Sequence, residues 1–284
     1  MSNQPRTYTR FPLSRRIEHI FLMISFITLA STGLPQKYPT SPVSILIVRA
    51  LGGIENLRSI HHFISILVML AVIYHLLVIG YYVFVLRTPW SMMLSLQDMK
   101  DGMQALLYNL GFAKAYPKMG RYTFEEKFEY WAFVWGYTIM GITGFIMWNP
   151  ITATRYLPGE FVPAAKAAHG GEAVLAVLAI IVWHMYGVNI KHVNRSIFTG
   201  KVTEEEMAHE HPRELEDIQA GTANRIPDAA TLRKRQRIFY PIAAILAVAM
   251  LAGVYGYINT EETALKTIPP ISTTVESPLP TPQP

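Results

Sequence analysis

The chain contains no cysteine among its 284 residues. Cysteine sulfur is required for iron–sulfur clusters, thiolate metal sites, covalently attached c-type haem and disulfides, so the sequence excludes all four. Any metal or redox centre in this protein must therefore be held by histidine, methionine or oxygen ligands.

Charged residues are also scarce. They make up 16% of the chain, whereas 51% of the residues are hydrophobic and the mean hydropathy is +0.22. This composition lies outside the range of soluble globular domains and predicts an all-α, polytopic membrane protein. The pI of about 9.3 would favour a nucleic-acid partner in a soluble protein. Here the basic residues follow the membrane topology, and no nucleic-acid partner is expected.

Five apolar segments are predicted to cross the membrane, at residues 17–33, 59–86, 128–148, 167–190 and 238–258. Pro35 is expected to end the first of them, because proline cannot continue a helix. The chain then divides into an N-terminal segment (1–16), a four-helix transmembrane domain (17–190), a polar segment (191–237), a fifth transmembrane helix (238–258) and a proline-rich tail (259–284).

Lysine and arginine are distributed unequally between the loops. The N-terminal segment, residues 87–127 and residues 191–237 together hold 19 of the 25 basic residues. The positive-inside rule therefore predicts that these segments are cytoplasmic and that the C-terminal tail lies outside, in a bacterial-type inner membrane. An amphipathic stretch at residues 98–110 is expected to lie along the membrane surface.

Histidines recur within the second and fourth spans. His169 and His184 are fifteen residues apart, and His61 and His75 are fourteen apart, so each pair lies near one face of its helix at two depths. An imidazole without a partner is costly in hydrocarbon. Two antiparallel helices with histidines at matching depths predict a four-helix bundle that holds two haems b by bis-imidazole ligation.

A cation precedes each outer histidine by three residues. Arg58 precedes His61 and Lys166 precedes His169, which makes both cations candidates for contacts with haem propionates. His192, His209 and His211 lie in the polar segment and are expected to be solvated.

A weak internal repeat accompanies the histidines. The first span ends in ITLASTGL and the third in TIMGITGF. His19 lies fourteen residues before Gly33, and Tyr130 lies fourteen before Gly144. Glycines such as Gly33, Gly141 and Gly144 are expected to let a porphyrin approach the backbone.

Several short motifs occur in an order that resembles the gamma (cytochrome b) subunit of membrane-bound formate dehydrogenases and the related hydrogenase cytochromes b. The resemblance covers residues 10–212. The matching pieces are Arg16-x-x-His19 with Thr32-Gly33, Arg58-Ser-Ile-His61, Gly120-Arg-Tyr122 followed by Lys127 and Tyr130-Trp131, Thr143-Gly144, His184-Met-Tyr186 and Gly200-Lys-Val202.

The resemblance implies four spans, two haems b and a quinone site on the cytoplasmic side. Carried over by motif, it implies an outer haem held by His61 and His169 and an inner haem held by His19 and His184. It also implies electron transfer across the membrane between the quinone pool and an outer-face partner, either an iron–sulfur subunit or a multihaem cytochrome c.

This sequence departs from the family at two points. The fourth-span histidines are one residue further apart than the family pattern, and His75 has no family counterpart as a ligand. The spacings of His61 to His75 and of His169 to His184 instead resemble the cytochrome b of quinol-oxidising bc-type complexes, in which His75 would face His184. The fourth ligand is therefore either His19 or His75.

The quinone site is expected near the loop before the third span, with Thr123, Glu125, Glu126 and Lys127 as candidates. Carboxylates there could exchange protons with a quinone oxygen. They could equally be the favourable negative charges at the start of a helix. Two further functions stay open at this stage, a bc-type cytochrome b that passes electrons outward to a c-type cytochrome, and a membrane anchor that binds haem without turnover.

Overall fold

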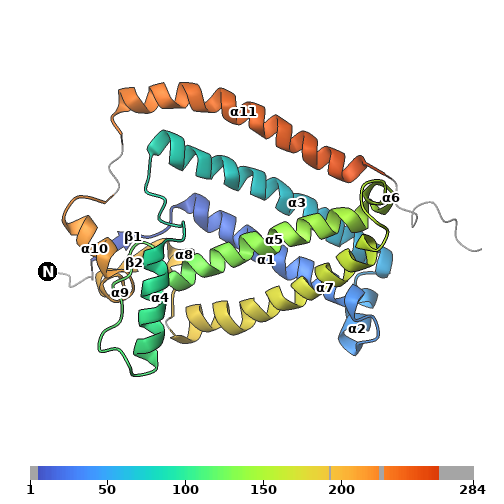
Figure 1. Cartoon of the computed structure of the whole chain (residues 1–284), viewed down its shortest axis with the longest axis horizontal. Coiled ribbons are helices and arrows are strands. Elements are labelled where there is room, and N and C mark those ends of the chain that lie inside the picture. Colours follow the sequence, from blue (N-terminus) through green and yellow to red (C-terminus); the bar gives the residue numbers. More distant parts are fainter. Residues whose placement is uncertain (1–5, 192, 224–226, 262–284) are drawn as a thin grey trace, which may run out of the picture.

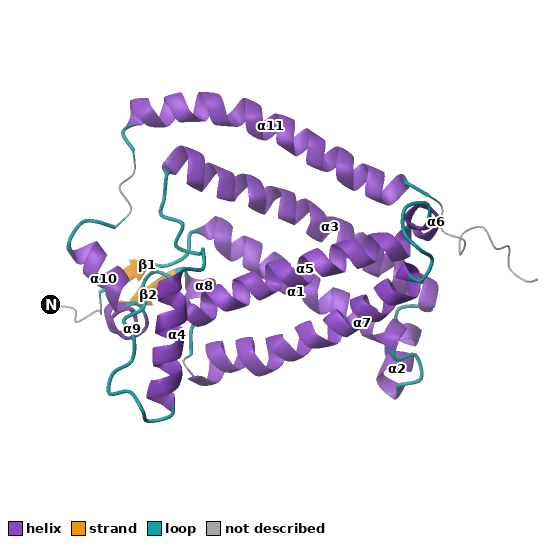
Figure 2. Cartoon of the chain, in the orientation of Figure 1, coloured by secondary structure: helices purple, strands orange, loops and turns teal. Residues whose placement is uncertain are grey.

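The computed structural model describes residues 6–191, 193–223 and 227–261, and helices dominate them (Figure 2). The helices are α1 (Leu13–Lys37), α2 (Pro42–Ala50), α3 (Ile54–Gly80), α4 (Leu96–Asn109), α5 (Phe124–Trp148), α6 (Pro150–Thr154), α7 (Phe161–Ala179), α8 (Ser196–Thr199), α9 (Glu204–Glu210), α10 (Pro212–Gln219) and α11 (Ala229–Asn259). Wider π-helical segments are Tyr81–Leu86, Ile180–His184 and Gly187–Lys191. One two-stranded antiparallel sheet pairs β1 (Thr7–Thr9) with β2 (Lys201–Thr203).

Among the described residues, five helices are long and apolar enough to cross a membrane, which confirms the predicted helical membrane fold. They are Leu13–Lys37, Ile54–Leu86, Phe124–Trp148, Phe161–Lys191 and Ala229–Asn259. Helices α1, α3, α5 and α7 run side by side as a bundle, and α11 lies along α3 (Figure 1). Within the bundle α1 packs on α3 and α7, and α5 packs on α7.

The connecting segments gather at the two ends of this bundle (Figure 1). Helices α4, α8, α9 and α10 and the small sheet lie at the end that we call the inner end, following the predicted sidedness. The short helices α2 and α6 lie at the opposite, outer end. The segments rich in lysine and arginine therefore share one end of the molecule.

Several helices extend beyond their apolar cores. Helix α1 continues through Pro35 to Lys37, contrary to the expected stop, because a proline in the last turn removes only one hydrogen bond. Helix α11 begins at Ala229 rather than at 238, since the Asp228 carboxylate accepts hydrogen bonds from the amides of Ala230 and Thr231 and so caps an earlier start. Of the predicted tail, residues 262–284 lie outside the described residues.

Helix α4 turns its apolar residues away from the protein. Asp98 and Asp101 are buried, whereas Leu96, Met99 and Met103 are exposed. An outward apolar face is the arrangement expected for a helix that lies along the membrane surface.

Helix α11 contacts the bundle at both of its ends. At the inner end Phe239 packs against Gly80 of α3, where an added Cβ would lie 3.3 Å from the Phe239 ring. At the outer end the Tyr257 hydroxyl donates to the Gly141 carbonyl oxygen of α5 at 3.3 Å, and Asn149 donates to the Tyr257 carbonyl oxygen at 3.0 Å. The fifth helix is therefore an integral part of the fold.

Candidate functional site

The outer histidines of α3 and α7 face one another inside the bundle. The ring centres of His61 and His169 are 6.4 Å apart, with an angle of 64° between the ring planes. An imidazole nitrogen lies about 2 Å from a bound transition metal and about 1.1 Å from its own ring centre, so two imidazoles across one metal have centres roughly 6 Å apart. The spacing therefore fits a shared iron.

A threonine from the neighbouring helix holds each outer imidazole. The Thr32 hydroxyl donates to the Thr28 carbonyl oxygen at 2.7 Å and lies 2.9 Å from Nδ1 of His61. Because the hydroxyl hydrogen is already used, Nδ1 must carry the hydrogen of the second bond. Thr143 repeats this arrangement, with 2.6 Å to the Ile139 carbonyl oxygen and 3.0 Å to Nδ1 of His169. Each threonine thus leaves Nε2 of its histidine with the free lone pair that a metal needs.

The glycine after each threonine makes room for the same histidine. A Cβ at Gly33 would lie 3.2 Å from Cε1 of His61, and a Cβ at Gly144 would lie 3.6 Å from Cε1 of His169 and 2.9 Å from the Tyr257 hydroxyl. These two glycines therefore admit an imidazole or a phenol close to the backbone; their predicted contact with a porphyrin stays a prediction. At Gly141 the corresponding space contains no atom within 4 Å among the described residues.

The inner histidines that face one another are His19 of α1 and His184, which follows α7. Their ring centres are 6.2 Å apart and their planes are tilted by 36°. His184 Nδ1 lies 2.9 Å from a carboxylate oxygen of Glu129, which again leaves Nε2 as the free nitrogen. His19 Nδ1 is buried and has no hydrogen-bond partner within the described part of the chain.

A π-helical segment, Ile180–His184, ends at the inner histidine of this span. A π-bulge accommodates one extra residue within a helix. The fifteen-residue spacing in this span therefore covers the same turns that fourteen residues cover elsewhere. This accounts for the one-residue departure noted in the sequence.

His75 has a different environment from His61, His169 and His184. Its Nδ1 lies 3.2 Å from both the Arg15 guanidinium and a Glu18 carboxylate oxygen, and its Nε2 lies 3.2 Å from the Tyr130 hydroxyl. Both ring nitrogens are thus engaged by protein groups. The structure brings His19, and not His75, to His184.

The weak repeat in the sequence corresponds to a pseudo-twofold arrangement in space. Glu18 contacts His75 from α1, as Glu129 contacts His184 from α5. Across the bundle His19 faces His184 with ring centres 6.2 Å apart, and Tyr130 faces His75 with ring centres 6.1 Å apart. The two inner pairs are therefore equivalent in position, but tyrosine takes the place of histidine in one of them.

The two basic residues predicted to contact propionates lie at the protein surface or pair with another residue. Arg58 forms an exposed ion pair with Glu55 at 3.2 Å, and Lys166 is exposed. A cation that the sequence reasoning missed, Lys37, extends from the end of α1 to within 3.0 Å of where a Cβ of Gly170 would lie. It therefore lies beside the residue that follows His169.

The predicted quinone residues begin α5 at the inner end. Thr123 and Glu126 form a capping box, in which the Thr123 hydroxyl accepts from the Glu126 amide and the Glu126 carboxylate accepts from the Thr123 amide. Glu125 accepts from the Tyr116 hydroxyl at 3.1 Å, and Lys127 forms a largely buried ion pair with Asp98 at 2.7 Å. All four side chains thus have structural partners.

The ion pair between Lys127 and Asp98 affects the pKa of the Asp98 carboxyl group. Burial would raise the pKa of its carboxyl group, but hydrogen bonds from Lys127 and Ser95 outweigh this effect and lower the pKa. The ion pair therefore stays charged and fixes α4 against α5.

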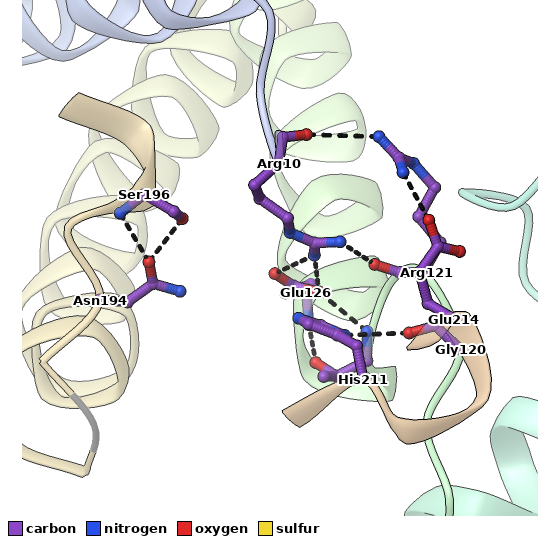
Figure 3. A network of polar contacts seen from close by, with 9 residues as sticks. Arg10, Gly120, Arg121, Glu126, Asn194, Ser196, His211 and Glu214 are labelled. Carbon is purple, nitrogen blue, oxygen red and sulfur yellow. Dashed lines mark hydrogen bonds and ion pairs between the residues drawn. The ribbon is translucent and has the colours of Figure 1, made fainter. Parts of the chain in front are cut away.

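Arg10 connects the N-terminal segment to this region (Figure 3). It is 2% exposed and forms an ion pair with Glu126 at 3.1 Å, while Arg121 pairs with Glu214 at 2.7 Å. His211 is 4% exposed and its Nδ1 lies 2.9 Å from the Gly120 carbonyl oxygen. The expectation that His211 is solvated is therefore wrong, whereas His209 is exposed as expected and His192 lies outside the described residues.

We call this group of Arg10, Arg121, Glu126, His211 and Glu214 the inner cap. A cavity of about 270 Å³ adjoins it and is lined partly by Arg10 and His211. Burial lowers the pKa of His211, and the nearby charge of Arg10 lowers it further. The cap therefore encloses a neutral histidine beside the buried guanidinium of Arg10, which pairs with the half-buried Glu126.

Sequence reasoning missed most of the residues that position the histidines. Thr32 and Thr143 were visible as part of the repeat, but no role was derived for them. Glu18 and Glu129 each precede, by one residue, the position that faces an inner histidine, which is a signal that the repeat could have supplied.

Comparison with known proteins identifies the family of the chain. Residues 10–200, about two thirds of the chain, match the family model described as prokaryotic cytochrome b561. The chain is 21% identical over 208 residues to the formate dehydrogenase, nitrate-inducible, cytochrome b556(Fdn) subunit of Escherichia coli K12, covering 73% of this chain and 89% of that protein. The proteins of the same name from Escherichia coli O157:H7 and Shigella flexneri match equally well. The chain therefore belongs to the prokaryotic cytochrome b561 family and is a multi-pass membrane cytochrome b.

Proposed function

We propose that the chain holds two haems b, an outer one between His61 and His169 and an inner one between His19 and His184. The observation that carries this proposal is that both pairs have ring centres 6.2 to 6.4 Å apart with Nδ1 of three of the four rings bonded to oxygen. Such bonds orient the ring and direct Nε2 toward the metal.

His19 is the better fourth ligand for a specific reason. His75 donates or accepts at both ring nitrogens, and its contact with the Tyr130 hydroxyl at 3.2 Å leaves no space for an iron between them. His19 instead faces His184 with ring centres 6.2 Å apart, a spacing that fits two imidazoles across one iron.

Haem b, when bound, supplies one-electron transfer. The residues of this chain then orient the imidazoles and set their basicity. Lys37, beside Gly170, is a further candidate for a propionate contact, besides Arg58 and Lys166. A single cation that reaches between α1 and α7 would neutralise a carboxylate at the outer end.

We further propose that the chain is the quinone-reactive subunit of an oxidoreductase complex. Electrons would pass between an outer-face partner, an iron–sulfur subunit or a multihaem cytochrome c, and a quinone at the inner end. The quinone takes two electrons and two protons and leaves as quinol. The location of Glu125 and Glu126 at the aqueous edge of α5 supports a supply of protons from that side.

The test of this function uses the purified chain with its haems reduced. A short-chain benzoquinone or naphthoquinone should oxidise the haems with saturation kinetics, and a quinone-site inhibitor should block the reaction. Haems that stay reduced would favour the remaining alternative, a membrane anchor that binds haem without turnover. The bc-type alternative required His75 to face His184, and the geometry gives it no support.

The ligand assignment has its own test. Replacement of His61 or His169 by alanine should remove the outer haem and leave the inner absorption component. Replacement of His184 should do the reverse. Loss of both components from every variant at unchanged protein yield would contradict the assignment of separate pairs.

A further inference from the structure

The second inner pair, His75 and Tyr130, is polar, lies within the membrane-spanning helices and has no role in haem binding as proposed. Polar and ionisable groups in such a place are expensive and usually functional. Arg15 and Glu18 join the pair from α1, and the side chains of Arg15, Glu18 and His75 retain 26%, 14% and 29% exposure respectively. The cluster is therefore partly accessible.

We infer that this pair binds the headgroup of the quinone. The inference rests on the proposed quinone reactivity of the chain and names its site. His75 Nε2 and the Tyr130 hydroxyl are the two groups that would bond a carbonyl oxygen, and they come from α3 and α5, across the bundle from His19 and His184.

The first support is the pseudo-twofold arrangement. Glu18, which contacts His75, directly precedes His19, and Glu129, which contacts His184, directly precedes Tyr130, so the two pairs lie close together along the bundle. A ligand bound there would be adjacent to the inner haem. Tyrosine in place of histidine, with a direct contact of 3.2 Å between the two side chains, makes the pair unsuited to iron and leaves a hydroxyl donor instead.

The second support is the environment of Nδ1. In His61, His169 and His184 this atom faces one oxygen acceptor, which fixes the hydrogen on Nδ1. In His75 it lies 3.2 Å from a donor, Arg15, and 3.2 Å from an acceptor, Glu18. Either tautomer can therefore be satisfied. Nε2 can donate to a quinone carbonyl oxygen in one tautomer and accept from a quinol hydroxyl group in the other.

The third support is the repeat itself. Arg15 precedes Glu18 by three residues, as Glu126 precedes Glu129 by three in the other half. The half that contains His184 thus has a carboxylate, Glu126, where the half that contains His75 has a guanidinium, Arg15. Arg15 in the place of a glutamate is therefore the second group beside Nδ1 of His75. It also forms an ion pair with the Glu18 carboxylate at 2.9 Å.

The site also connects to the inner surface. Tyr130 lies four residues after Glu126 on α5, so the two side chains share one face of the helix, about 6 Å apart along its axis. Glu126 in turn pairs with Arg10 of the inner cap. Residues 123–127, where the sequence predicted the quinone site, therefore lie about one helical turn closer to the aqueous side than His75 and Tyr130.

The test measures quinone binding and haem oxidation separately. The variants are Tyr130→Phe, which removes the hydroxyl, His75→Leu, which removes the ring nitrogens, and His75→Gln, which keeps an N–H donor. Tyr137→Phe is the matched control, since it lies on the same helix two turns deeper. The dissociation constant of a short-chain naphthoquinone and of a short-chain benzoquinone is measured by equilibrium dialysis with the full chain, and kcat and KM are measured for oxidation of the haems.

We expect Tyr130→Phe and His75→Leu to weaken quinone binding and raise KM by about tenfold each, the size of one lost hydrogen bond in a site of low polarity. His75→Gln should remain within about threefold of wild type, Tyr137→Phe should be unchanged, and all variants should retain two haems. If His75→Leu fails to fold, Tyr130→Phe still tests whether the pair binds the quinone.

The outcomes separate the inference from the function on which it rests. Wild-type binding in Tyr130→Phe, together with rapid haem oxidation by quinone, would overturn the assignment of this site and leave the quinone-reactive function standing. Loss of a haem from Tyr130→Phe or His75→Gln would show that the pair supports a ligand and would also overturn it. Absence of quinone binding in the wild-type chain would contradict both proposals.

Discussion

Single hydrogen bonds distinguish the histidines of this bundle. His61 and His169 bond a threonine, His184 bonds a carboxylate, and His75 lies between a carboxylate and a guanidinium. The acceptor at Nδ1 decides which nitrogen keeps a lone pair and how basic that nitrogen is. The neighbour in the adjacent helix therefore determines whether an imidazole is suited to a metal.

The outer threonines can be tested individually. Thr143→Val keeps the shape of the side chain but removes the acceptor for His169 Nδ1–H, which makes the imidazole a weaker donor. We expect outer-haem affinity to fall by about 10- to 100-fold and the midpoint potential of that haem to rise by tens of millivolts. Thr138→Val on the same helix is the control, because its hydroxyl bonds only the Val134 carbonyl oxygen. Equal haem titrations of the two variants would show that the contact does not tune the haem.

His211 gives the inner cap a dependence on pH. Burial and the adjacent Arg10 lower its pKa below the ordinary value of 6.5, and Glu126, Glu210 and the Gly120 carbonyl oxygen only partly oppose this. The unfolded cap thus binds more protons than the folded cap once the pH falls below about 6.5, so its stability decreases with acidification.

Hydrogen exchange of residues 204–219 should therefore be faster near pH 5.5 than near pH 7.5 after correction for the intrinsic rate. His211→Gln should reduce this difference, whereas His209→Gln should not, since His209 is exposed. A wild-type exchange rate that is independent of pH would contradict the account of the buried neutral histidine.

At the scale of elements, apolar pattern predicted the number and order of the spanning helices but not their ends. Pattern marks the part of a helix that lies in hydrocarbon, while the ends depend on caps such as Asp228 and on packing. The π-helical segment Ile180–His184 could not be predicted from pattern either, because it is visible in the sequence only as one extra residue between two histidines. That extra residue is why the sequence alone could not choose between His19 and His75.

The contact between α3 and α11 depends on a glycine. At Gly80 an added side chain would meet the Phe239 ring at 3.3 Å, whereas at Gly253 of α11 it would meet no described atom within 4 Å. Gly80→Leu should therefore lower the unfolding free energy by about 1 to 3 kcal/mol through overpacking. Gly253→Leu should leave it nearly unchanged, and thermal unfolding in detergent measures both.

Both glycine variants should retain their haems, since none of the four proposed ligands, and none of the groups bonded to their Nδ1 atoms, lies in α11. Haem loss from Gly80→Leu at a temperature where the protein stays folded would mean that α11 supports the haem sites directly.

At the scale of the whole molecule, the basic segments share one end of the bundle, and the positive-inside rule predicts that this end faces the cytoplasm. The absence of native cysteine permits a direct test with single introduced thiols. In intact cells a membrane-impermeant maleimide should label Tyr156→Cys at the outer end and leave Thr199→Cys at the inner end unlabelled until the cells are opened. The reverse pattern would invert the proposed direction of electron transfer.

The bundle as a whole has two halves, α1 with α3 and α5 with α7, that repeat the same contacts to their histidines. Each half places a glutamate and a threonine from one helix against two histidines of the next. The sequence revealed the repeat but not its meaning, because the equivalence of His19 with Tyr130 depends on contacts between helices distant along the chain.

The measurement that tests this account most directly is the number of haems b per polypeptide, by pyridine haemochrome, in the purified wild-type chain and in His19→Gln and His75→Gln. The account predicts two haems in the wild type, one in His19→Gln and two in His75→Gln. Loss of a haem from His75→Gln with two retained in His19→Gln would contradict it, because the inner haem would then lie in the half that we assign to the quinone.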